Sequence, residues 1–411
     1  MKTDKIKRLA RIYPWVFGLS LDLIFWVPLN TLFLSTVKAQ GSEQIVLMNT
    51  ISSILVLCTQ PILMRATPYL GNTLSVRLGL LCLFAANVLF LVGADFFWLL
   101  VGTILYRVGR TITPLAGVML KNNLDEIGAS DQYISIRNQS TLVYSVSTMI
   151  VSLISGFMFN LHPYLPVICG TVLIGGCLAL AFTTADYTPY NRVQKHSDQS
   201  KKIRMTPVLW LIVISYGLFV AIILEGSSNI KLFIQENLMK DYNLEKVTVL
   251  LSVIVLLSRL GSVAGNLFFR KMHLKFKDKC HWIFASMLIA AFLLLILSGA
   301  LPIPTIMKVV GMATGFVLLM FTMDPATVLL QTEALEYIDK SNQQSVFVLL
   351  GFAQNLVAAA VNLCMSAILM KWPMLVAIIG LLVISGVELV IAFQLFRLLK
   401  NPKNKKCDQG I

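Results

Sequence analysis

The amino-acid sequence predicts an all-α polytopic membrane protein, with about twelve transmembrane helices in two pseudo-symmetric six-helix halves. Hydrophobic residues make up 57% of the chain and charged residues only 13%, whereas about 25% of the residues in a soluble domain are charged. Apolar stretches recur along the whole chain, and most reach the roughly 20 residues that a helix needs to cross a bilayer. One stretch of the first half is repeated in the second half, which predicts the two-fold organisation.

The expected spans follow from the lengths of the apolar stretches. Their approximate limits are residues 14–36, 44–64, 75–94, 97–119, 138–159, 163–183, 207–229, 247–269, 281–300, 305–329, 344–369 and 373–397. The first stretch follows a basic start, exceeds the length of a signal peptide and has no small-residue cleavage site. We therefore expect an uncleaved first helix.

One long polar connection divides the chain. The segment of residues 184–206 is basic and lacks the apolar residues that could form a core of its own. We expect an N-terminal six-helix half at residues 1–183 and a basic cytoplasmic linker at 184–206. A C-terminal six-helix half at 207–398 and a cytoplasmic tail at 399–411 complete the predicted organisation.

The clearest repeat relates residues 105–127, LYRVGRTITPLAGVMLKNNLDEI, to residues 316–338, FVLLMFTMDPATVLLQTEALEYI. An offset of 211 residues aligns Pro114 with Pro325. Each copy places charge in an apolar span close to this proline, which removes a backbone hydrogen bond and tends to bend a helix. Repeated halves with buried charge beside a helix-bending residue are typical of transporters.

The positions of the basic residues explain the formal net charge of +14. Lysine and arginine gather in clusters that flank apolar stretches, at residues 2–11, 192–204, 270–279 and 397–406. With both termini in the cytoplasm, these clusters lie on the inner side, as the positive-inside rule requires. We expect a multi-pass protein of the cell (plasma) membrane, in a bacterial inner membrane, that functions as a monomer and binds no nucleic acid.

The sequence contains no pattern that predicts a cofactor, a metal site or catalysis. No pair of the seven cysteines has the spacing of metal ligands. No phosphate-binding loop indicates ATP as an energy source, and no arrangement of nucleophile, base and acid indicates an enzyme. The expected partners are the lipid bilayer, a small-molecule substrate and protons.

The span count, the two repeated halves and the basic linker resemble the major facilitator superfamily over nearly the whole chain. The family has a Gly-X-X-X-Asp-Arg-X-Gly-Arg-Arg motif between helices 2 and 3. Here that place holds Gly71, Asn72 and Arg77, and the acidic residue is missing. The Gly-Pro pair that marks antiporters in helix 5 is absent. The arginine of helix 4 that members associate with proton transfer has two counterparts, Arg107 and Arg110.

Two of the buried charges are expected at matching depths. Asp22 lies about eight residues, or roughly 12 Å, from the cytoplasmic start of helix 1, and Arg110 lies similarly far from the cytoplasmic end of helix 4. The resemblance implies that helices 1, 4, 7 and 10 line a central cavity, which would hold both side chains. We hypothesise an Asp22–Arg110 pair that opens when substrate or a proton arrives. A static pair that only fixes packing is the alternative.

Further charges fall in helices 7, 8 and 10. Asp324 precedes Pro325, so an acid is expected beside a helix bend, and Asp22 and Asp324 are the leading candidates for a proton site. Glu225 is either a substrate contact near the outer mouth or an interfacial residue. Arg259 would either neutralise Asp324 or bind an anionic group.

The predicted site contains two groups of residues. Those for substrate binding or proton coupling are Asp22, Arg107, Arg110, Asp324 and Glu225; those that would line the cavity are Trp26, Asn30, Tyr144, Asn229, Arg259 and Asn355. Trp26 and Asn30 follow Asp22 at helical spacing, although packing would also explain the tryptophan. We expect no histidine relay, because the four histidines fall in loops or at helix ends. Glu388 has no visible partner and is left out.

These features predict a secondary active transporter of a small, amphipathic organic solute, which works by alternating access and is coupled to protons. A flippase of the same fold for lipids or lipid-linked molecules is the alternative, and it would need a lateral opening between helices. An enzyme would need the catalytic constellation that the sequence lacks.

Overall fold

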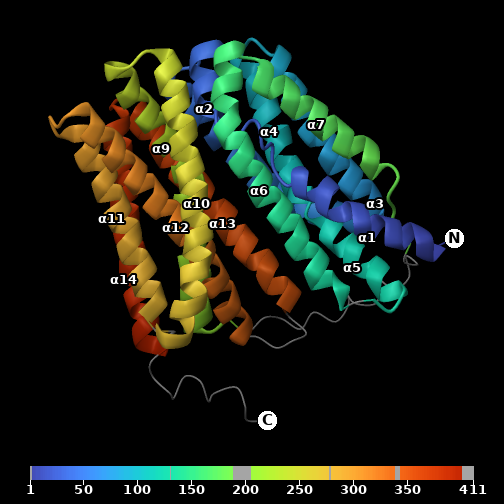
Figure 1. Cartoon of the computed structure of the whole chain (residues 1–411). Coiled ribbons are helices and arrows are strands. Elements are labelled where there is room, and N and C mark those ends of the chain that lie inside the picture. The colour runs from blue at the N-terminus through green and yellow to red at the C-terminus, as the bar shows by residue number, and fades with distance from the viewer. Residues whose placement is uncertain (1, 130, 188–204, 277–278, 338–342, 400–411) are drawn as a thin grey trace. The chain divides into compact units, whose positions relative to one another are not determined.

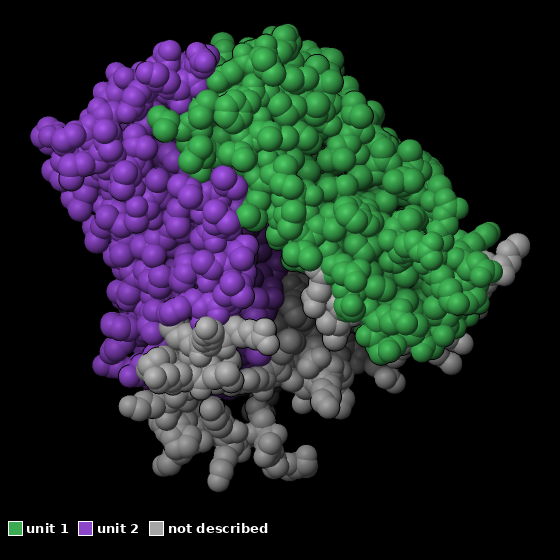
Figure 2. Space-filling model, viewed as in Figure 1, with its two compact units in different colours: residues 1–199, 248–253 green, residues 200–247, 254–411 purple. Residues whose placement is uncertain are grey.

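The computed structural model describes residues 2–129, 131–187, 205–276, 279–337 and 343–399. Every regular element in this part of the chain is a helix, which confirms the predicted class. The chain divides into two compact units, residues 1–199 with 248–253 and residues 200–247 with 254–411 (Figure 2). Most of the expected linker and nearly all of the expected tail lie outside the described residues, so the predicted domain boundaries stay predictions.

The helices follow one another in the order shown in Figure 1. The first unit contains α1 (Lys2–Leu19), α2 (Asn30–Leu32), the π-helix η1 (Phe33–Val37), α3 (Ser42–Val92), α4 (Phe96–Ile112), α5 (Leu115–Glu126), α6 (Gln132–Leu161) and α7 (Leu165–Ala181). The second unit contains all or most of α9 (Pro207–Asp241), α10 (Leu244–Phe276), α11 (Cys280–Ala300), α12 (Thr305–Glu336), α13 (Gln343–Leu369) and α14 (Met374–Leu399).

Each unit has its own apolar core. In the first unit α4 packs along α3, and α1 packs against α6. In the second unit α9 packs against α12, α13 and α14, while α11 lies beside α12 and α14 (Figure 1).

Nine helical segments in the described part of the chain are long and apolar enough to cross a membrane. They correspond to nine of the twelve expected spans, and the exceptions are the first, the fourth and the sixth. The sixth is α7, a shorter apolar helix of 17 residues. The first and the fourth are each divided into shorter helices, so the prediction that they are continuous is wrong.

The first expected span is interrupted between Leu19 and Asn30. Pro28 lacks a backbone N–H and disfavours helical geometry at the residue before it, which explains why a helix does not run through this position. The Asp22 carboxylate accepts a hydrogen bond of 2.8 Å from the Leu23 N–H, a local bond that competes with helix geometry. Asp22 therefore lies in irregular backbone and not on a helical face.

The fourth expected span is interrupted at Thr113 and Pro114, where α4 ends and α5 begins. Because proline has no N–H, Pro114 cannot bond the carbonyl of Arg110 four residues earlier. The last regular helical hydrogen bond of α4 runs from the Thr113 N–H to the Gly109 carbonyl, at 2.9 Å. Arg110 thus lies in the final turn of α4.

The second and third expected spans form one element, α3, which is interrupted at Gly71. This residue has φ +74° and ψ 159°, a conformation that favours glycine. The connection between the two spans is therefore helical on both sides of a single glycine.

Pro325, the repeat of Pro114, lies inside a continuous helix, α12. Its missing N–H leaves the carbonyl of Phe321 without the usual helical bond. That carbonyl lies against Gly265 of α10, where a Cβ atom would overlap the Phe321 oxygen. The nearby Gly261 also lies close to Val317, since a Cβ atom there would come within 2.9 Å of the Val317 oxygen. Both contacts agree with the close helix packing that pairs of small residues permit.

Replacing Gly265 with valine is expected to destabilise the second unit by about 1–3 kcal/mol, because the branched side chain would force α10 away from the Phe321 carbonyl. Thermal unfolding of the purified protein in detergent measures this as a lower midpoint. Gly386→Ala is the matched control, since no atom lies within 4 Å of the Cβ position at this helical glycine. Equal midpoints for the two variants would contradict the packing account.

Candidate functional site

The Asp22 carboxylate is held by three groups of the first unit. Its Oδ2 lies 3.0 Å from the Arg110 Nη1, and its Oδ1 accepts a 2.5 Å hydrogen bond from the Tyr106 hydroxyl. The Leu23 N–H also donates to Oδ1. Arg110 in turn donates to the Tyr106 oxygen at 3.4 Å. These side chains join the interruption of the first span to the last turn of α4.

The two partners of this ion pair differ in exposure. The side chain of Asp22 is 7% exposed and that of Arg110 is 43% exposed. Solvent or a solute can therefore reach the arginine, while the carboxylate is covered by its partners. Such a pair can be opened from the side of the arginine.

Of the two arginines predicted in α4, Arg110 pairs with Asp22. Arg107 is half-buried one turn earlier, and its backbone carbonyl accepts a hydrogen bond from Thr111. Tyr144 of α6 is half-buried and interacts electrostatically with Arg110. Arg110 thus interacts with side chains from three places: the interruption of the first span, α4 and α6.

Trp26 and Asn30 do not form the helical stripe with Asp22 that the spacing predicted, because the backbone between them is not helical. Trp26 is 5% exposed and stacks on Phe90 of α3, with ring centroids 4.0 Å apart. Phe33 adds an edge-on contact. These rings pack against one another, and the role of Trp26 in lining a cavity stays a prediction. Asn30 begins α2 and is half-buried.

Asp324 of the second unit is held by α10. Ser262 and Asn266 both donate hydrogen bonds to its Oδ2, the latter at 3.1 Å. No described residue forms an ion pair with this carboxylate. Arg259 lies half-buried on the same helix and forms no ion pair with Asp324 among the described residues, and both roles considered for that arginine stay predictions.

Helix α9 carries two of the predicted residues in buried positions. Glu225 is 8% exposed and Asn229, one turn later, is 1% exposed. Neither amide atom of Asn229 has a hydrogen-bond partner among the described residues. A buried amide without a partner is costly, so a ligand or a water is the natural complement. Asn355 lies half-buried in α13.

Two buried acids have partners that sequence reasoning missed. Glu333 of α12 lies 2.6 Å from the His281 Nε2, and their side chains are 5% and 3% exposed. His281 does stand at the start of α11, but it is buried, so a helix-end position did not exclude a buried histidine pair. Glu388 of α14 accepts a 2.5 Å hydrogen bond from Ser215. In both cases the partner belongs to a distant helix, which no local spacing reveals.

A carboxylate outside the helix 2–3 motif bonds to that motif. Asp186, just after α7, accepts hydrogen bonds from Asn72 at 2.8 Å and from Asn122 of α5 at 3.2 Å. Arg77 donates to the carbonyls of Phe182 and Thr184. The acid that the motif lacks is therefore supplied by the chain that follows α7.

Comparisons with known proteins agree with this architecture. The model of the family described as Major Facilitator Superfamily matches residues 15–362. No protein of curated function matches the sequence.

Three solved structures share the fold but are distant from this chain in sequence. A bacterial homologue of the human lysosomal transporter Spinster has 14% identity and a TM-score of 0.67, with 96% of this chain and 97% of that chain covered. The nucleoside transporter NupG has 13% identity and a TM-score of 0.67, over 97% and 99% of the two chains. A D-xylose-proton symporter has 14% identity and a TM-score of 0.66, over 96% and 97%. These similarities show the fold.

Replacing Tyr106 with phenylalanine is expected to lower the stability of the first unit by about 1.5–3 kcal/mol, the usual worth of a hydrogen bond to a charged group. The thermal unfolding midpoint in detergent measures the effect. Tyr164→Phe is the control, because the Tyr164 hydroxyl has no hydrogen-bond partner in the described part of the chain while its ring packs on Phe33. A Tyr106→Phe midpoint no lower than that of the control would show that the phenol does not hold Asp22.

Proposed function

The chain belongs to the Major Facilitator Superfamily, whose members are secondary transporters and not enzymes, and we propose that it moves a small, amphipathic organic solute by alternating access coupled to protons. The observation that carries the proposal is the Asp22 carboxylate, held by Tyr106 and Arg110 in a helix interruption. An acid in that position can change its charge and its partners together. We place the protein in the cell membrane with both termini in the cytoplasm. Its apolar spans support a multi-pass membrane protein, and the basic clusters that flank them favour this orientation.

The proposed cycle uses the pair as follows. A proton that binds Asp22 neutralises it, and the attraction to Arg110 falls to that of a neutral hydrogen bond. The guanidinium is then available to an acceptor group on the solute. Release of the solute and the proton restores the pair. The D-xylose-proton symporter of similar fold agrees with proton coupling for this architecture, although its substrate says nothing of the solute here.

The second unit offers two further groups to this function. Asp324, beside Pro325, is a second proton site in the proposal, and its hydroxyl and amide donors on α10 hold the charged form. Asn229 of α9 supplies an amide whose atoms lack partners among the described residues. We assign it a hydrogen bond to the solute.

Asp22→Asn and Arg110→Gln are each expected to reduce solute-dependent proton flux at least tenfold, because neither variant can exchange the ion pair for a proton. The assay uses liposomes that hold the purified protein and an internal pH dye, challenged with pooled solutes under an imposed gradient. Asp95→Asn, at the exposed start of α4, is the control that keeps normal flux. Wild-type flux in both pair variants would remove the pair from the mechanism, and lipid translocation without any flux would indicate a flippase.

Asn229→Leu is expected to weaken solute binding about tenfold, the usual effect of one lost hydrogen bond of about 1.4 kcal/mol. The same change removes an unpaired buried polar group, so the thermal midpoint should stay equal or rise. Ser227→Ala on the same helix is the control, since its hydroxyl bonds the Leu224 carbonyl. A fall in stability with unchanged binding would show that Asn229 is structural.

A further inference from the structure

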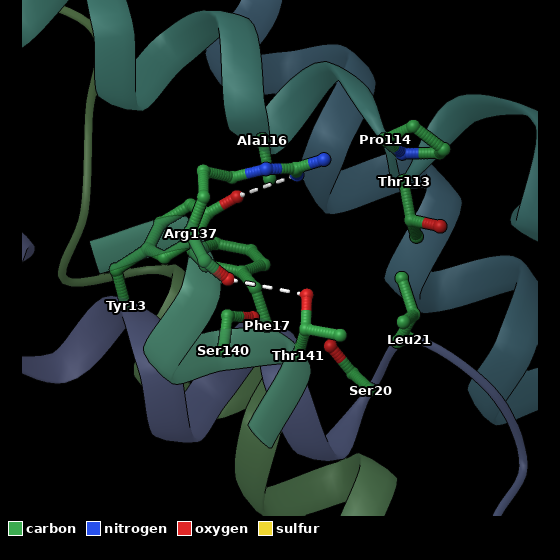
Figure 3. A pocket seen from close by; sticks show the side chains of 10 residues that line it. All are labelled: Tyr13, Phe17, Ser20, Leu21, Thr113, Pro114, Ala116, Arg137, Ser140 and Thr141. Atoms are coloured by element: carbon green, nitrogen blue, oxygen red, sulfur yellow. Dashed lines mark hydrogen bonds between the residues drawn. The ribbon is translucent and has the colours of Figure 1, made fainter. Parts of the chain in front are cut away.

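A small cavity of the first unit lies beside the interruption that follows α1 and beside the joint between α4 and α5. It has a volume of about 40 Å³ and is lined by Tyr13, Phe17, Ser20, Leu21, Thr113, Pro114, Ala116, Arg137, Ser140 and Thr141 (Figure 3). These residues come from α1, from the interruption that follows it, from the joint between α4 and α5, and from α6. The cavity is therefore distinct from the Asp22–Arg110 pair, whose residues are not part of its wall.

Arg137 of α6 brings a positive charge to this cavity. Its guanidinium donates a 3.2 Å hydrogen bond to the Tyr13 hydroxyl (Figure 3). No described carboxylate forms an ion pair with it, and none lines the cavity. The phenol of Tyr133 also lies close by. Arg137 is an exposed residue, and on the cavity side the protein meets its charge with dipoles and not with a carboxylate.

Several hydroxyl groups of the wall can donate to a ligand. The Tyr13 oxygen accepts from Arg137, so its own O–H is available. Among the described residues, no partner is present for the hydroxyls of Ser140 and Thr113, both of which line the cavity. Ser20 and Thr141 use their protons on the carbonyls of Val16 and Arg137. The wall is therefore rich in donors around one cation, which is the environment that an anion requires.

We propose that this cavity binds a small monoanion, the size of a chloride ion or of a single carboxylate group, on the Arg137 guanidinium. A volume of 40 Å³ is about three times the minimum for one water molecule, roughly 10–15 Å³, which is room for a small anion. The anion is either a free inorganic ion or the carboxylate of an organic acid. The bound anion would contact the interruption that follows α1 and the joint between α4 and α5, and so stabilise their present arrangement.

The test measures thermal unfolding of the full-length protein in detergent. The sodium salt of a bulky sulfonate, which carries no carboxylate, keeps ionic strength constant while sodium chloride or sodium acetate replaces it. The expected result is a saturable rise of the midpoint with at least one of the two anions. A rise of the midpoint with chloride alone would identify the ligand as an inorganic ion. A rise with acetate, against which chloride competes, would identify the ligand as a carboxylate. Arg137→Gln should weaken binding and so raise the half-saturating anion concentration about tenfold or more.

Arg11→Gln is the matched control, because it removes an exposed arginine of α1 that does not line the cavity. The proposal is overturned if neither anion gives a saturable rise, or if Arg137→Gln responds like Arg11→Gln. Should Arg137→Gln not fold, anomalous scattering from wild-type crystals grown in sodium bromide decides the matter. A bromide peak beside the Arg137 guanidinium supports the site, and no peak there overturns it. None of these readouts depends on transport.

Discussion

Asp22 and Arg110 approach each other to 3.0 Å between two interrupted helices, and each makes the charge of the other tolerable in a membrane. One unpaired charge at the bilayer centre costs about 2.5–3.5 kcal/mol on insertion scales. Two opposite charges about 4 Å apart near a protein surface attract each other by roughly 4 kcal/mol, and the exposed part of Arg110 reduces this. Two such charges would cost about 5–7 kcal/mol on the same scale, so the attraction offsets only part of the cost of burying them, and the pair is not strongly stabilising. A proton or a solute group needs only a modest energy to separate it, which is the property that a coupling site requires.

The two repeated prolines show how context decides what a helix breaker does. Pro114 ends α4, whereas Pro325 lies within the continuous α12. In α12 the carbonyl that proline leaves free lies against Gly265 of α10, so the neighbouring helix accommodates the defect. Near Pro114 the chain instead separates into α4 and α5. The same residue thus gives the first unit a joint beside its ion pair and gives the second unit a tight contact beside Asp324.

Periodicity and apolar length predicted the helical class and nine of the twelve spans, because burial in a bilayer depends on the composition of long stretches. They missed the interruption after Leu19, since a single proline and a local aspartate bond decide it. Matching depth was enough to place Asp22 near Arg110. The Tyr106 phenol could have been found from its four-residue spacing to Arg110 in a helix. The partners of Asp324, Glu333 and Glu388 could not, because they lie on helices that meet only in the folded chain.

The most direct test of the account is an infrared pH titration of the purified protein that follows the carbonyl band of protonated carboxylic acids. The account predicts a titrating band that disappears in Asp22→Asn and that changes in Tyr106→Phe, because the phenol bonds the same carboxylate. A spectrum of Asp22→Asn identical to that of the wild type over the whole pH range would contradict the claim that Asp22 exchanges Arg110 for a proton.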